Sequence, residues 1–200
     1  MKRATAHLKK ADPILAAIIE QVGPCGLTPR EPTFETLARS ITFQQLSGKA
    51  AGTIFGRLRK AVGRRFTATA FLRLSEEELR ACGLSRQKIA SLTDLAEHVA
   101  SRKINFKKLH QLEDKQIIEL LSQVRGVGVW TVQMFLMFAL ERPNVMPTGD
   151  LGIRNAIKKA YGLEAAPKPL EIAQFAEKWH PHCTVACWYL WRSLDGPAEI

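Results

Sequence analysis

The sequence lacks long apolar runs, extracellular cysteine patterns and a leader-like segment. Its longest apolar stretch, residues 127–140, contains Gln133 and falls short of the roughly 18 residues that cross a membrane. No apolar segment precedes Asp12-Pro13, so we expect no signal peptide. The cysteines are few and show no paired spacing: Cys25, Cys82, Cys183 and Cys187. These absences exclude a membrane-spanning protein and a disulfide-stabilised scaffold, and they predict reduced thiols in a cytoplasm of the bacterial type.

Acidic residues are scarce beside basic ones. The 200 residues carry 29 Lys and Arg against 19 Asp and Glu, a formal charge of +10, and the sequence pI is about 9.7. A basic protein attracts polyanions, so nucleic acid or an acidic membrane surface is the favoured class of partner. Hydrophobic residues make up 46% of the chain, which excludes a mainly disordered protein. The length suits one globular unit, or two lobes, with a buried core.

Alternating strand patterns are also missing, and helical periodicity takes their place, so we predict an all-α fold. Several expected helices start behind a capping residue, namely Asp12 with Pro13, Thr33, Ser75 in a capping box, Ser85, and Asp150. Others are expected from Lys49 to Val62, from Asp114 to Leu121, from Val129 to Leu140, from Pro169, and from about His182 to Ser193. Gly52 and Gly56, four residues apart on one helix face, predict close packing against a neighbouring helix.

Residues 121–132 form a tight turn between two of these helices. The two glycines of the turn, Gly126 and Gly128, allow the backbone to approach another backbone closely. The amides after the turn lie at a helix N-terminus, where they are free to bind phosphate oxygens. Any tight helix–helix turn can use such a Gly-x-Gly. Apolar residues at helical spacing on both sides favour phosphate binding by the N–H groups of Gly126, Gly128 and Val129.

Asp150 lies in the segment Met146-Pro147-Thr148-Gly149-Asp150. Its simplest role is to cap the helix that begins at Leu151. A capping carboxylate in an apolar loop is also held rigidly, so it can stabilise a positive charge that develops beside it. The sequence therefore marks Asp150 as a candidate catalytic residue.

Hairpin, apolar helix, loop and Pro147-Thr148-Gly149-Asp150, in that order, resemble the helix–hairpin–helix/Gly-Pro-Asp DNA glycosylase superfamily. The aspartate matches, whereas the Gly-Pro order of the superfamily's name does not. Two further segments are similar to the 3-methyladenine DNA glycosylase II (alkylbase glycosylase) branch: residues 37–47, and residues 179–182 leading into 187–192. The resemblance extends from Asp12 to Leu194.

The resemblance implies two helical lobes with the active-site cleft between them. One lobe is residues 34–140, with the hairpin at about 114–140; the other is residues 1–33 with 141–200. The implied partner is damaged double-stranded DNA, bound by a monomer that associates with the nucleoid. Such an enzyme flips the damaged nucleotide into a pocket, because the base is out of reach within the duplex.

Matched positions suggest which side chains would do this. Trp130 and Trp191 match base-stacking tryptophans of the family, with Met134 one turn after Trp130, whereas Trp188 is expected in the core. Gln45, with Leu46 next, would fill the gap left in the duplex. The alternative is a polar helix end with Leu46 in the core.

The implied reaction is hydrolysis of the N-glycosidic bond of alkylated purines, in base excision repair. Cationic bases favour an aromatic pocket and leave readily. Asp150 would stabilise the oxocarbenium-like sugar, and whether it also activates water stays open. Trp130 occupies the place where glycosylases with lyase activity carry a lysine, so we expect a monofunctional enzyme. 3-Methyladenine and 7-methylguanine lead among the lesions; ethenoadenine, hypoxanthine and 1-methyladenine stay open.

No cofactor is expected to be required. Cys183 and Cys187 are too few for an iron–sulfur loop of the endonuclease III type. Zinc at these cysteines with His180 and His182 is disfavoured, because the segment is predicted to be a packed helix. The resemblance also implies a structural sodium or potassium ion at the hairpin, held by the backbone carbonyls of Ser122, Val124 and Val127.

Two rival functions remain. One is a helix–hairpin–helix module that only binds DNA, which needs no aromatic pocket beside a carboxylate; Asp150, Trp130 and Trp191 argue against it. The other is a bifunctional glycosylase/lyase, which Trp130 disfavours.

Overall fold

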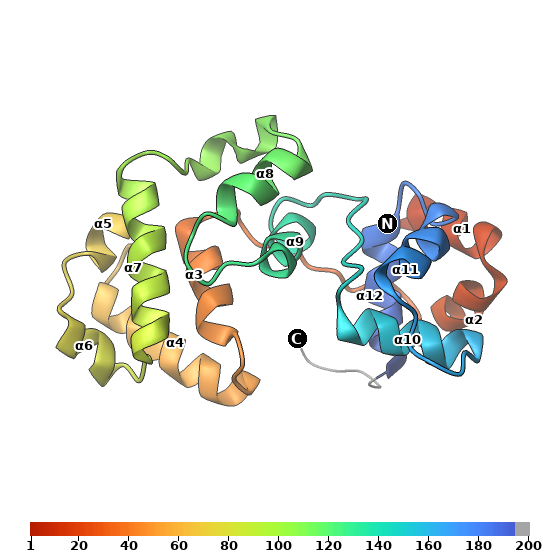
Figure 1. The fold of residues 1–200 in the computed structure, drawn as a ribbon, viewed down its shortest axis with the longest axis horizontal. Helices are drawn as coiled ribbons and strands as arrows, with labels where there is room; N and C mark the ends of the chain where they lie inside the picture. Colours follow the sequence, from red (N-terminus) through yellow and green to blue (C-terminus); the bar gives the residue numbers. More distant parts are fainter. Residues whose placement is uncertain (195–200) are drawn as a thin grey trace. The chain divides into compact units, whose positions relative to one another are not determined.

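The computed structural model describes residues 1–194, and within this range every regular element is helical (Figure 1). The all-α prediction is therefore confirmed for the described residues. The chain divides into two compact units, a terminal unit of residues 1–29 and the chain from 136 onward, and a central unit of residues 30–135. The boundaries expected from the sequence, 33/34 and 140/141, lie a few residues later. None of the described helices is both long enough and apolar enough to cross a bilayer.

The central unit is organised around helix α7. Its elements are α3 (Phe34–Phe43), α4 (Gly48–Val62), α5 (Ala68–Phe71), α6 (Glu76–Ala81), α7 (Arg86–Ala100), the 3-10 helix η1 (Phe106–Gln111), α8 (Asp114–Leu121) and the first part of α9 (Val129–Phe138). Helices α3, α5 and α6 pack against α7, and α4 packs against α3 (Figure 1). Leu37, Leu58 and Leu92 are completely buried in this unit. Burial of such side chains stabilises the unit by about 1.5–3 kcal/mol each.

Hydroxyl caps fix where several of these helices begin. Thr33, Ser75 and Ser85 each accept a hydrogen bond from the amide three residues further on, as their positions predicted, and Ser47 does the same for α4. Each cap satisfies an amide that has no partner within its helix.

The terminal unit is built around α12. Its helices are α1 (Lys2–Ala11), α2 (Pro13–Val22), α10 (Leu151–Tyr161), α11 (Pro169–Glu177) and α12 (Cys183–Leu194). Helices α1, α2 and α10 pack against α12 (Figure 1). Every residue from Cys183 to Leu190 is buried, as in a helix surrounded on all sides. This confirms the predicted core position of Trp188.

Asp12 links α2 and α10 with the turn that follows α11. It caps α2 by accepting from the amides of Ile14 and Leu15, and only 1% of it is exposed. Its Oδ2 accepts hydrogen bonds from the Tyr161 hydroxyl of α10, from Trp179 Nε1 at 2.8 Å and from Lys178 Nζ at 3.1 Å.

These donors decide the charge state of Asp12. Burial would raise the pKa of the carboxyl, but the hydrogen bonds, those from Tyr161 and Trp179 foremost, outweigh it and lower the pKa. Asp12 is thus an ionised anchor within the core.

Three helical elements were not predicted from the sequence, and the packing of one helix face was predicted wrongly. Helix α1 has no side-chain cap and buries only Ala4 and Leu8, so its pattern is weak. The short α5 and η1 were also missed, although Thr67 caps α5. Gly52 and Gly56 are exposed, and a Cβ added to either would meet nothing within 4 Å, so the predicted close packing is wrong.

Candidate active site

Asp150 begins α10 and points its carboxylate toward α12. Its Oδ1 accepts from the amide of Ile153 at 2.7 Å, which confirms the predicted N-cap, and from Trp191 Nε1 at 2.9 Å. The residue is 8% exposed. The structure thus brings together two residues selected from the sequence, and the indole N–H fixes the direction of the carboxylate.

Gly152 makes this hydrogen bond sterically feasible. A Cβ at this position would lie 2.9 Å from Trp191 Cδ1, 3.1 Å from its Nε1 and 3.0 Å from Asp150 Oδ1. Real Cβ atoms do not approach other atoms so closely, so any larger residue would displace the indole, the carboxylate or both. Phe138 supports the Trp191 ring from α9, with the two ring centroids 6.0 Å apart.

The loop before Asp150 is held by α12. Thr184 accepts from the amide of Val145 at 3.1 Å and donates to the carbonyl of Arg142 at 2.6 Å. The thiol of Cys187 points to Met146 Sδ at 3.4 Å, and burial raises the pKa of this thiol well above its ordinary value. Cys187 is therefore a neutral thiol that packs against the loop before Asp150.

The hairpin between α8 and α9 presents backbone amides. Gly126 has φ +75°, and a Cβ on it would lie 2.6 Å from Ser91 Oγ, so the turn requires glycine for both reasons. The first bond within α9 runs from the Val132 amide to the Gly128 carbonyl. The exposed amides of Gly128 and Val129 therefore come before the first hydrogen bond of α9 and have no acceptor within the helix. Phosphate binding needs such amides.

Helix α3 ends in a short exposed loop, residues 44–47, which we call the plug loop. Gln45 is exposed and has φ +57°, a strained value for a residue with a side chain. Leu46 is 38% exposed, so the alternative that placed it in the core is wrong. Both side chains are accessible, as a plug would require.

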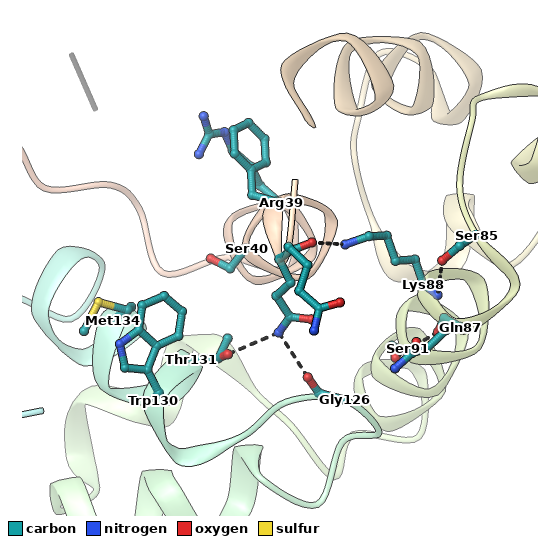
Figure 2. A pocket seen from close by; sticks show the side chains of 13 residues that line it. Arg39, Ser40, Ser85, Gln87, Lys88, Ser91, Gly126, Trp130, Thr131 and Met134 are labelled. Carbon is teal, nitrogen blue, oxygen red and sulfur yellow. Dashed lines mark hydrogen bonds between the residues drawn. The ribbon is translucent and has the colours of Figure 1, made fainter. Parts of the chain in front are cut away.

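A cavity of about 620 Å³ lies within the central unit, beside the plug loop and the hairpin (Figure 2). Trp130 and Met134 line it from α9 and project next to each other, in agreement with the expected shared wall. Trp130 is 49% exposed, unusual for a tryptophan whose only role is packing.

Side chains that the sequence analysis did not select complete this cavity. Arg39 and Phe43 lie one turn apart on α3, with the guanidinium 3.8 Å from the ring centroid. Burial, with repulsion from Arg30, lowers the pKa of Arg39. The i, i+4 spacing of Arg39 and Phe43 was a signal available in the sequence.

Two side chains anchor the plug loop, one of them that of its own first residue, Gln44. Gln44 Nε2 donates to the Gly126 carbonyl at 3.0 Å and to Thr131 Oγ1 at 3.2 Å. Lys88 Nζ donates to three backbone carbonyls, those of Ile41, Thr42 and Gln44, at 2.9, 2.9 and 2.8 Å. Neither contact has a local signature in the sequence.

One protein-family model matches more than half of the chain. The family model described as "HhH-GPD superfamily base excision DNA repair protein" matches residues 38–182, a range that includes the plug loop, the hairpin and Asp150. The chain belongs to the HhH-GPD superfamily. The family inferred from the residues is thereby confirmed.

Individual relatives agree with this assignment to the HhH-GPD superfamily. DNA-3-methyladenine glycosylase 1 of Schizosaccharomyces pombe is 35% identical over 96% of this chain and 87% of its own length. A solved structure of 3-methyladenine DNA glycosylase from that yeast, in complex with abasic DNA, has a TM-score of 0.84 at 36% identity, covering 96% of both chains. DNA-3-methyladenine glycosidase from Bacillus halodurans also has a TM-score of 0.84, at 35% identity over 95% of this chain and 88% of its own.

The hairpin cation that the HhH-GPD resemblance implies can be tested against its surroundings. Ser122 Oγ is buried and has no hydrogen-bond partner among the residues that the structure describes. The Val124 carbonyl accepts from the amide of Val127, which closes the turn. The three implied ligands are backbone carbonyl oxygens, a kind of ligand that suits a hard cation. Within residues 1–194 no three His, Cys, Asp or Glu side chains gather as a metal site.

Proposed function

We propose that this protein is a monofunctional DNA glycosylase that hydrolyses the N-glycosidic bond of alkylated purines, of the 3-methyladenine and 7-methylguanine type, in base excision repair. The observation that carries the proposal is Asp150, fixed by the amide of Ile153 and the indole of Trp191. The names of the relatives support the substrate class, because they denote DNA-3-methyladenine glycosylases.

The hairpin and the plug loop would bind double-stranded DNA. The exposed amides of Gly128 and Val129 lie at the positive end of α9, where phosphate oxygens bind. Gln45, with Leu46 beside it, would enter the duplex and fill the space that the flipped nucleotide leaves. The formal charge of +10 adds attraction that does not depend on sequence.

The flipped base would stack on Trp130, with Met134 beside it. An alkylated purine carries positive charge, and the electron-rich faces of aromatic rings attract cations. Such a base is also a good leaving group, so the reaction does not depend on a strong general acid. Stacking on a half-exposed indole therefore serves both selection and positioning of the lesion.

Asp150 would stabilise the positive charge that develops on the sugar as the base departs. Its Oδ1 is held by two donors, so the carboxylate needs no reorientation during the reaction. The carboxylate would also orient the water that attacks the sugar. Trp191 thus acts on the carboxylate through its N–H, in addition to any stacking on the base.

The absence of lyase activity follows from Trp130. An indole cannot form the Schiff base through which a lysine at this position would cleave the strand.

A monovalent cation held by the carbonyls of Ser122, Val124 and Val127 would supply positive charge beside the phosphates. The relatives include proteins of a fission yeast and of a bacterium, so the bacterial-type cytoplasm expected from the sequence stays a prediction.

Base release from methylated duplex DNA tests the proposal. The protein should release free methylpurine and leave intact strands with abasic sites, while unmethylated duplex yields nothing. The Asp150→Asn variant, purified in the same way, controls for contaminating glycosylases.

Two results would point to the rival functions. Strand nicking together with a covalent adduct trapped by borohydride would show a glycosylase/lyase. Tight DNA binding without base release would show a binding module.

A further inference from the structure

The plug loop is poorly supported by its own backbone. Gln45 adopts a left-handed conformation that a residue with a side chain rarely occupies. The loop's own backbone hydrogen bond, from the Leu46 amide to the Phe43 carbonyl, is long at 3.4 Å. A loop of this kind keeps its shape only when neighbouring elements hold it.

Lys88 holds the loop from α7. Its ammonium has three donors, and each reaches a carbonyl at the C-terminal end of α3, those of Ile41, Thr42 and Gln44. These carbonyls have no amide partner within the helix, and they form the negative end of its dipole. One ammonium group therefore satisfies three acceptors immediately before Gln45, and Figure 2 shows it reaching the end of α3 from α7.

Gln44, the first residue of the plug loop, anchors the loop to the hairpin. Its side-chain amide donates to the Gly126 carbonyl and to Thr131 Oγ1, the two residues labelled at the dashed lines in Figure 2. Gly126 belongs to the turn that presents the phosphate-binding amides, and Thr131 lies in the first turn of α9 beside Trp130. The plug loop is thus tied to the same backbone that would bind the DNA strand.

We propose that Lys88 and Gln44 are positioning residues that clamp the plug loop between α7 and the hairpin, so that Gln45 and Leu46 enter the duplex preorganised. The proposal rests on the proposed function, because it assigns a role to the plug. A preformed plug loses less conformational entropy on insertion than a mobile one. The clamp also fixes the distance between the plug and the phosphate-binding amides.

The clamp matters most where the DNA stack is intact. In a fully paired duplex, flipping requires a plug to fill the gap and oppose return of the base. Where the lesion faces an abasic analogue, the stack is already interrupted and the plug contributes less. Loss of the clamp should therefore slow excision from paired DNA by about 10–100-fold, and much less from the interrupted duplex.

The test uses two variants and one control. Lys88→Met keeps the length of the side chain and removes all three donors, and Gln44→Met removes the bonds on the hairpin side. Lys60→Met, an exposed position in the last turn of α4, removes the same charge without touching the loop. Circular dichroism and melting temperature verify that each variant is folded. If one of the two test variants does not fold, the other one decides.

Two readouts separate this proposal from the proposed function. The first is hydrogen exchange of the free protein over residues 44–48, which needs no catalysis; it should be faster in both variants and unchanged in Lys60→Met. The second is single-turnover excision, compared between a fully paired methylpurine and the same lesion opposite a tetrahydrofuran abasic analogue.

Faster exchange with a loss confined to paired DNA supports the clamp. Unchanged exchange overturns it, and so does an equal loss on both substrates, which would indicate a general structural effect. If the unaltered protein excises nothing, the proposed function fails, and hydrogen exchange alone decides whether the clamp exists.

Discussion

Asp12 and Asp150 lie in the same unit of the chain and make the same local contacts. Each caps a helix by accepting a backbone amide, α2 in one case and α10 in the other. Each also accepts an indole N–H, from Trp179 and from Trp191 respectively. As helix caps, the two aspartates cannot be told apart from the local sequence.

Their surroundings separate the two aspartates. Asp12 is 1% exposed, and its Oδ2 accepts hydrogen bonds from a tyrosine of α10 and from a tryptophan and a lysine in the turn after α11. Asp150 is 8% exposed, follows the exposed Gly149 and precedes Leu151, which is 65% exposed. The same cap therefore anchors a core at one site and presents a carboxylate near the surface at the other. Function depends on what surrounds the cap.

Asp12→Asn should give the largest loss of stability. The substitution keeps the cap but removes the charge that Lys178 and Tyr161 face, so the free energy of unfolding should fall by about 2–4 kcal/mol. Urea unfolding measures this loss. The excision rate of the folded fraction should stay unchanged, and a selective loss of excision would break the distinction between the two aspartates.

Gly152→Ala should impair excision far more than it lowers stability. Its Cβ would push Trp191 away from Asp150, and displacement of a catalytic group should cost about 10–100-fold in single-turnover rate. Gly56→Ala is the matched control, because a Cβ there meets nothing within 4 Å. Equal rates in the two variants would show that the indole–carboxylate geometry is unimportant.

The two tryptophans allow a paired test of smaller effect. Trp191→Phe keeps a ring beside Phe138 but removes the N–H to Asp150, and it should slow excision by about 5–30-fold. Trp179→Phe removes the N–H to Asp12, and it should lower the free energy of unfolding by about 1–2 kcal/mol. The two losses should stay separate. A Trp191→Phe variant that loses only stability, or a Trp179→Phe variant that loses only excision rate, would contradict these roles.

The smallest predicted effect is the contribution of Asp12 to the loss of stability in acid. Its pKa is lower in the folded protein than in the unfolded chain. A lowered pKa contributes stability above the unfolded value, near 4, and that contribution disappears as the pH falls through the folded pKa. The free energy of unfolding, measured from about pH 6 down to pH 2, should therefore fall less steeply for Asp12→Asn than for the unaltered protein.

Local signals predicted much of the fold. Caps such as Thr33, Ser75 and Ser85 mark helix starts because they act within three residues of chain. The same holds for Asp150 and for the turn at Gly126. Helix α1 escaped prediction because it lacks a cap and buries few residues.

Long-range contacts escaped prediction. Lys88 meets carbonyls more than forty residues away, and Gln44 meets the hairpin 82 and 87 residues further along the chain. The Tyr161 and Trp179 contacts of Asp12 span even more. No local pattern encodes such pairs, since they exist only after the helices have packed.

Asp150, and not Asp12, is the residue proposed to take part in the chemistry. The most direct test is the single-turnover rate of methylpurine release from duplex DNA by Asp150→Asn, with Asp12→Asn and the unaltered protein measured alongside. Asn is as good a helix cap as Asp, so stability and DNA binding should change little while the rate falls by at least about 10³-fold. A rate for Asp150→Asn equal to that of the unaltered protein would contradict the account.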